Sequence, residues 1–172
     1  MSDSEDVSSV LTNKEVWKLI QFPKYLTSKE PVTLSEGSYH AFELDSTDRE
    51  NKFILDVNRG RIELKYTLQT RANTTVRLAR LDVNGPHRNP KEDYHVEPDD
   101  PFYEVHEQCI GKVFRNEAHI HIYREGFGDR WAYPVEELFD NTDVFKSTFY
   151  KFLKFCNVHS EIKLLGDLYD YF

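Results

Sequence analysis

Three apolar segments, at residues 53–57, 61–69 and 76–83, follow one another with only short interruptions. The middle segment alternates strictly between apolar and polar residues, and successive side chains of a strand point to opposite faces of a sheet. Residues 58–60 and 73–74, which separate the segments, contain the asparagine or glycine that tight turns prefer. The pattern predicts sequential strands of an antiparallel meander with one buried and one polar face.

Two helices are predicted beside this sheet. Thr12 and Glu15 have the spacing of a capping box, which predicts a short N-terminal helix that ends near Pro23. Apolar residues recur at helical spacing over 144–156, which predicts a C-terminal helix that packs its aromatic stripe on the sheet. The expected fold class is therefore α+β: an antiparallel meander, with room for strong curvature, packed against a C-terminal helix and accompanied by a short N-terminal helix.

The 172 residues fit one domain. Residues 1–10 are expected to be a disordered acidic tail, and residues 11–172 are expected to form a single α+β domain. No apolar run approaches the ~20 residues that span a bilayer, and the start lacks the pattern of a secretion signal. Cys109 and Cys156 do not make a disulfide framework. We therefore expect a cytoplasmic protein with no membrane partner.

A second alternating segment carries most of the candidate chemistry. Its two isoleucines are expected to enter the core, which places His119, His121 and Tyr123 in a row on the opposite face. Histidine titrates near ~6.5 and can act as an acid or a base, and arginine offers planar donors to phosphate oxygens. If this row meets the polar face of the meander and the loop after Val83, the cluster has the chemistry of a metal-independent ribonuclease.

This hypothesis assigns a role to each candidate residue. The catalytic residues, which would move protons, are His119, His121, Tyr123 and His87. The residues expected to hold phosphate or stack on RNA are Lys65, Arg71, Arg80, Arg88, Arg124 and Trp131. The reaction would need no metal and no cofactor, and the partner would be RNA or a nucleoprotein complex.

The same residues also permit a metal interpretation. Two histidines at i and i+2 of one strand can share a zinc or iron ion in a metal-dependent hydrolase, with Asp82, His87 or Asp129 as further ligands. The arginines nearby count against concentrating more positive charge there. The row is also compatible with ordinary polar decoration of an exposed sheet.

The distribution of charge supports a third hypothesis. The chain has a net charge of -8, which argues against tight binding to duplex nucleic acid. Residues 56–91 have 8 Lys/Arg and 3 Asp/Glu, whereas residues 92–108 have 7 Asp/Glu and no Lys/Arg. Asp99, Asp100 and Glu104 belong to this acidic segment. A non-catalytic protein could use such a surface to inhibit a nucleic-acid enzyme, which would then be its cognate partner.

Three stretches resemble an uncharacterised family of small proteins found in bacterial genomes and their mobile elements. They are residues 78–90 (LARLDVNGPHRNP), 119–132 (HIHIYREGFGDRWA) and 152–158 (FLKFCNV). The resemblance covers roughly residues 50–158 and carries over no catalytic residue. A mobile-element setting implies either a ribonuclease of the toxin–antitoxin type or a phage-encoded anti-defence protein, such as an anti-CRISPR inhibitor.

Overall fold

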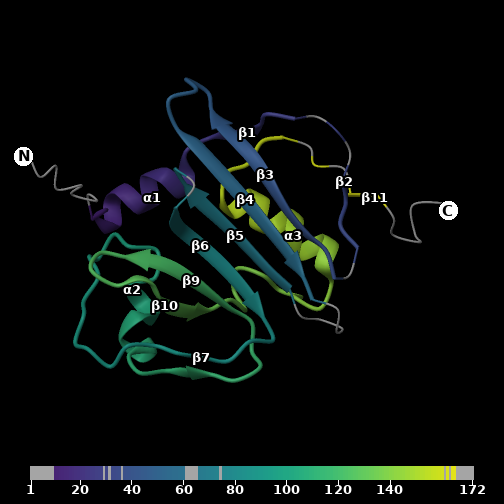
Figure 1. Cartoon of the computed structure of the whole chain (residues 1–172). Helices are drawn as coiled ribbons and strands as arrows, with labels where there is room; N and C mark the ends of the chain where they lie inside the picture. Colours follow the sequence, from purple (N-terminus) through teal and green to yellow (C-terminus); the bar gives the residue numbers. More distant parts are fainter. Residues whose placement is uncertain are drawn as a thin grey trace, which may run out of the picture.

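The computed structural model describes residues 10–165 except for 29, 31, 36, 61–65, 74, 161 and 163. These residues form a seven-stranded sheet in the order β1-β3-β4-β5-β6-β9-β10, and all neighbouring strands are antiparallel (Figure 1). The strands are Lys24–Leu26 (β1), Tyr39–Ser46 (β3), Lys52–Arg59 (β4), Tyr66–Ala72 (β5), Val76–Val83 (β6), His119–Arg124 (β9) and Gly128–Pro134 (β10).

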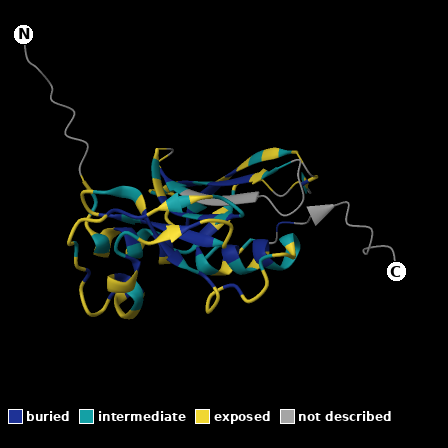
Figure 2. Ribbon diagram, turned by 90° about the horizontal axis from the view of Figure 1, so that it is seen from below, coloured by how far each residue is buried: buried dark blue, intermediate teal, exposed yellow. Residues whose placement is uncertain are grey.

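Helices and two short strand pairs complete the described fold. The helices are Asn13–Gln21 (α1), Tyr103–His106 (α2) and Phe145–Phe155 (α3), with a 3-10 helix at Glu107–Cys109. Val32–Thr33 (β2) pairs in parallel with Leu164–Leu165 (β11), and His87–Arg88 (β7) pairs antiparallel with Val113–Phe114 (β8). Figure 2 shows helical segments on one side of the sheet. The predicted α+β fold is thus confirmed.

Both predicted terminal helices are present. The capping box forms as expected, since the Glu15 amide donates to Thr12 Oγ1 and the Thr12 amide donates to the Glu15 carboxylate. Helix α1 buries Val16 and Ile20, and α3 buries several aromatic side chains of the predicted stripe against the same core. The N-cap of α3 is Val144, whose side chain makes no capping hydrogen bond.

A buried lysine joins the ends of α1 and α3. Lys24 is fully buried, and its Nζ donates to the carbonyl oxygens of Ile20 at 2.7 Å, Phe22 at 2.9 Å and Cys156 at 2.7 Å. Burial lowers the pKa of Lys24 to about 8. Carbonyl groups at helix ends lack partners within the helix, so one ammonium group here satisfies two helix ends at once.

Residues 84–118 connect β6 to β9. They include the acidic segment 92–108, which contains α2 and the start of the 3-10 helix. Phe102, His106 and Cys109 are buried in this connection at helical spacing. Their burial against the sheet outweighs the acidic composition. The predicted strand at 61–69 is present from Tyr66 onward, and residues 61–65, with Lys65, lie outside the described part.

Candidate functional site

The pairing of β6 with β9 builds the centre of the candidate site. Arg80 lies opposite His121, and Asp82 lies opposite His119, so all four side chains share one face of the sheet. Asp82 Oδ2 is 3.2 Å from His121 Nε2 and 3.9 Å from His119 Nε2. Two imidazoles therefore face a single carboxylate.

Backbone carbonyl groups fix the tautomer of both imidazoles. His119 Nδ1 is 2.9 Å from the carbonyl oxygen of Glu117, and His121 Nδ1 is 2.9 Å from that of Asp129. A carbonyl oxygen only accepts hydrogen bonds, so each Nδ1 carries a proton, and in the neutral form of either ring the lone pair lies at Nε2. Neither Nε2 has a hydrogen-bond partner among the described residues.

The two rings are buried, whereas the sequence predicts a polar row on the face opposite the core. His119 is 0% and His121 1% exposed. The ring of His87, from β7, lies 4.4 Å from that of His121 in a T-shaped contact, and the ring of Phe114, from β8, stacks on His119 at 4.7 Å. Burial is the main cause of the lowered pKa of His119. At neutral pH His119 is therefore uncharged.

Three side chains of this cluster could together hold a metal ion. The ligating atoms of Asp82, His119 and His121 all lie within 4.8 Å of one another. Zinc takes imidazole nitrogens at about 2.0–2.1 Å and carboxylate oxygens at about 2.0–2.2 Å, so a modest closure would bring all three to an ion. Hydrogen bonds from the other ring nitrogen to backbone carbonyls are the usual outer support of histidine ligands.

Arg80 shares the carboxylate with this cluster. Its Nε donates to Asp82 Oδ2 at 3.1 Å, and its Nη1 donates to Asp129 Oδ2 at 2.9 Å. The bond from Arg80 occupies one of about four lone-pair sites of the Asp82 carboxylate. The Asp129 carboxylate also pairs with Arg77 at 3.3 Å, and it is not part of the ligand group.

His87 lines the cluster but points its Nε2 elsewhere. This atom is 3.0 Å from the carbonyl oxygen of Arg130 and 3.0 Å from Asn89 Oδ1, both acceptors, so it carries a proton. Burial and the neighbouring His121 and His119 lower the pKa of His87. Of the further ligands named by the metal interpretation, Asp82 is thus the one in position.

Two residues predicted to contact RNA lie in the interior. Arg124 is fully buried, and its Nη2 donates to Asp100 Oδ1 at 3.0 Å while its Nε donates to the Tyr133 hydroxyl at 2.9 Å. Trp131 is also fully buried and its ring packs near that of Tyr94. Neither side chain can reach a ligand on the surface.

The remaining predicted residues are spread over the sheet. Arg71 pairs with Asp56 at 2.6 Å, two strands away from β9. Tyr123 is half-buried beside the core, and Arg88 is exposed on β7. The structure therefore brings together Arg80, His87, His119 and His121, and it does not bring Arg71 or Tyr123 into that cluster.

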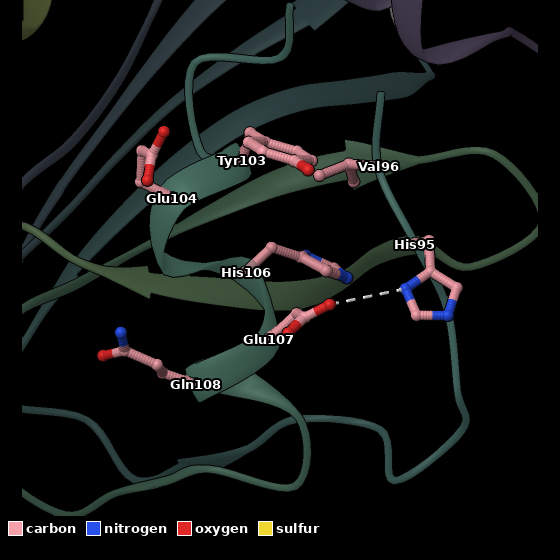
Figure 3. A pocket seen from close by; sticks show the side chains of 7 residues that line it. All are labelled: His95, Val96, Tyr103, Glu104, His106, Glu107 and Gln108. Atoms are coloured by element: carbon pink, nitrogen blue, oxygen red, sulfur yellow. Dashed lines mark ion pairs between the residues drawn. The ribbon is translucent and has the colours of Figure 1, made fainter. Parts of the chain in front are cut away.

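The acidic segment holds a hollow of its own. Figure 3 shows it lined by His95, Val96, Tyr103, Glu104, His106, Glu107 and Gln108. His106 is buried, with Nδ1 2.9 Å from the Tyr133 hydroxyl and Nε2 2.6 Å from the carbonyl oxygen of Tyr94. Both nitrogens are engaged, so this histidine supports the fold rather than offering a free functional group.

Only part of the predicted inhibitory surface is exposed. Asp99 and Glu104 are exposed, but the Asp100 side chain is 4% exposed and bound to Arg124 and to Trp17 Nε1. Charge reversal at Asp100 would disturb the core rather than test a surface. Sequence reasoning also missed Asn89 and Phe114, because no local pattern marks them as neighbours of β9 and β10.

No helix in the described part of the chain has both the length and the apolar character that crossing a bilayer requires. No curated protein and no solved structure gives a significant match to the chain. A family model matches residues 11–158, which extends further toward the N-terminus than the resemblance noted in the sequence. The chain therefore belongs to the Family of unknown function (DUF6978).

Proposed function

We propose that this protein is a metal-dependent hydrolase that cleaves phosphodiester bonds in RNA. Its metal site consists of His119, His121 and Asp82, and the ion is a divalent transition metal such as Zn²⁺. One observation carries the proposal: two buried Nε2 atoms with no hydrogen-bond partner among the described residues face one carboxylate. A lone pair 3.2 Å from a carboxylate oxygen is unfavourable unless a cation or a proton lies between them.

The geometry favours a cation over a pair of proton-transfer groups. A metal-independent ribonuclease needs one histidine as a base and another as a protonated acid, and both must reach the substrate. Here both rings are buried and hold the same tautomer, and burial lowers the pKa of His119. These features suit a ligand better than an acid. The metal-independent reaction stays a prediction that the experiment below can decide.

In the proposed reaction one water is consumed. His119, His121 and Asp82 would hold a zinc ion, which would lower the pKa of a bound water to about 7 and so provide a nucleophile at neutral pH. The water oxygen would bond to phosphorus, the bond from phosphorus to one ribose oxygen would break, and the proton lost by the water would end on that leaving oxygen. Arg80 pairs with Asp82, and both Arg80 and Arg77 pair with Asp129; these two guanidinium groups can stabilise the charge that develops on the phosphoryl group.

Metal binding is tested first. Protein stripped with EDTA and dialysed is titrated with Zn²⁺ by calorimetry, and we expect one ion per chain. Asp82→Asn keeps the side-chain volume but removes the charged ligand, so we expect affinity to fall more than about tenfold, the loss that an outer-shell change already causes. Asp129→Asn removes the same charge from the same cluster without removing a ligand, and it should bind almost as wild type does.

RNA cleavage is measured on the same proteins. Labelled structured RNA is incubated in EDTA or with added zinc or manganese, and cleavage is expected only with metal and not with Asp82→Asn. Cleavage in EDTA would instead assign His119 and His121 to the metal-independent reaction. Absence of stoichiometric metal binding would overturn the metal site itself.

The biological setting is part of this proposal. We propose a cytoplasmic protein encoded in bacterial mobile elements; two buried free cysteines support the cytoplasmic location, and the resemblance of residues 78–90, 119–132 and 152–158 suggests the mobile-element setting. Neighbouring genes distinguish the two expected settings. An adjacent antitoxin-like gene would support a toxin-like nuclease, whereas neighbouring phage anti-defence genes would support the inhibitor hypothesis and its exposed acids, Asp99 and Glu104.

A further inference from the structure

A groove runs beside the histidine cluster. It has a volume of about 590 Å³ and lies at the β7–β8 pair. Its lining residues come from both sides of that pair and are Pro86, His87, Arg88, Val113, Phe114, Arg115 and Asn116. All of them belong to the part of the chain that the structure describes, and the groove is open to solvent.

The groove is basic although the whole chain is acidic. Arg88 and Arg115 are exposed, and none of the lining residues is acidic. The neighbouring Glu117 turns back on the backbone, where its carboxylate accepts from the amides of Arg115 at 2.6 Å and Asn116 at 3.0 Å. In a chain with net charge -8 this gives a locally basic surface, whose charge is complementary to that of a polyanion.

The groove shares its wall with the candidate metal site. His87 lines the groove, and its ring contacts the rings of His121 at 4.4 Å and His119 at 5.8 Å. Phe114 also lines the groove and stacks on His119 at 4.7 Å. A chain lying in the groove is therefore separated from the cluster by single side chains.

We propose that this groove binds single-stranded RNA, with Arg88 and Arg115 on phosphates and the exposed surfaces of Pro86 and Val113 against bases. Unpaired bases can reach such apolar surfaces, whereas the bases of a duplex are stacked inside it. The inference rests on the proposed function in one respect, the choice of RNA as substrate. To the proposed function it adds the position of the RNA strand on the protein and the residues that bind it.

Binding is measured without metal so that it is independent of the metal site. A fluorescein-labelled oligouridylate is titrated with protein in EDTA, and fluorescence anisotropy gives the affinity. The double variant Arg88→Ala/Arg115→Ala should bind about tenfold more weakly at low salt, with a salt slope smaller by about 1.4, since each phosphate contact on a single strand contributes about 0.7. The variant Lys18→Ala/Lys154→Ala loses two exposed charges from α1 and α3 and should bind as wild type does.

A second experiment tests whether the RNA lies in the groove. Val113 is 41% exposed, so Val113→Cys gives a reactive thiol in the groove. The native Cys109 and Cys156 are buried, and burial raises their pKa to about 11 and about 12, so they react slowly. Oligouridylate should slow alkylation of Val113→Cys at least about threefold and leave Leu138→Cys, at a position 43% exposed, unaffected.

The outcomes separate this inference from the proposed function. Equal affinity of wild type and the arginine double variant, or no protection at Val113→Cys, would overturn the groove even if zinc binds. Equal affinity for a duplex of the same length would show that the occupant is wrong. RNA binding in EDTA together with failed zinc binding would support the groove and overturn only the metal site.

Discussion

At the scale of single residues, Arg124 shows how strand alternation places a charge. It is expected to hold phosphate because it follows the histidine row, but it lies an even number of positions from Ile120 and Ile122, on their face. There it is buried with Asp100. The sequence alone could have shown that Arg124 points to the buried face, because it alternates with Tyr123 in the strand. The sequence could not have shown that its acidic partner is Asp100, 24 residues earlier.

The pair of Arg124 and Asp100 predicts a large effect of one substitution. Asp100→Asn leaves the buried guanidinium without its counter-charge, and breaking a buried ion pair costs about 3–5 kcal/mol in free energy of unfolding. Urea denaturation measures this loss. The neighbouring exposed Asp99→Asn should change the free energy by less than about 0.5 kcal/mol. Equal stability of the two variants would contradict the structural role of Asp100.

The same pair predicts how acid acts on the fold. Burial raises the pKa of Asp100, but the hydrogen bonds from Arg124 and from the Phe102 amide outweigh it, and the net pKa is lowered. A lowered carboxyl pKa gives stability that is present above its unfolded value and is lost as pH falls toward the folded one. Between pH 5 and 8 Asp100 therefore contributes fully.

At the scale of elements, Asn89 closes the outer edge of β10. Its Oδ1 accepts from the Ala132 amide at 2.8 Å, and its Nδ2 donates to the carbonyl oxygens of Ala132 at 2.7 Å and Cys109 at 2.9 Å. One buried amide thus replaces a neighbouring strand at this position. The sequence analysis places a loop after Val83, but the strand edge that this loop covers is set by long-range packing.

Removal of this amide should weaken β10. Asn89→Ala leaves the Ala132 N–H and C=O buried without a partner, and each such group costs about 1–3 kcal/mol. We expect a loss of about 2 kcal/mol or more in urea denaturation. Hydrogen exchange of the Ala132 amide should also quicken more than that of the Ile122 amide on β9. Uniform acceleration at both amides would mean that global stability alone has changed.

At the scale of the whole molecule, local patterns predicted the meander and the terminal helices, because period and caps are local properties. The bounds predicted for residues 76–83 agree with β6, and the alternating segment with His119, His121 and Tyr123 lies in β9. The burial of His119 and His121 could not be predicted in this way. It depends on His87 and Phe114, which reach β9 from the long connection between β6 and β9. His119, His121 and Asp82 were nevertheless candidates from residue type and spacing alone.

Buried histidines also make the stability of the whole fold depend on pH. Burial is the largest cause of a lowered pKa at His87, His106 and His119, so the fold holds them uncharged more than the unfolded chain does. The stability that the neutral histidines give is complete when the pH is above their unfolded pKa of about 6.5, and it is lost as the pH falls below that value. The free energy of unfolding, measured with urea in EDTA, should therefore fall from pH 7.5 to 5.5. A flat or rising profile would contradict neutral histidines.

The buried Lys24 has a consequence for how the chain is synthesised. Its ammonium binds two carbonyl groups from residues 20 and 22, and a third from Cys156, which leaves the ribosome 132 residues after Lys24. Although domains tend to form in order from the N-terminus during translation, these three contacts can be complete only after α3 has been synthesised. Helix α1 is therefore held in its final place only once α3 has emerged.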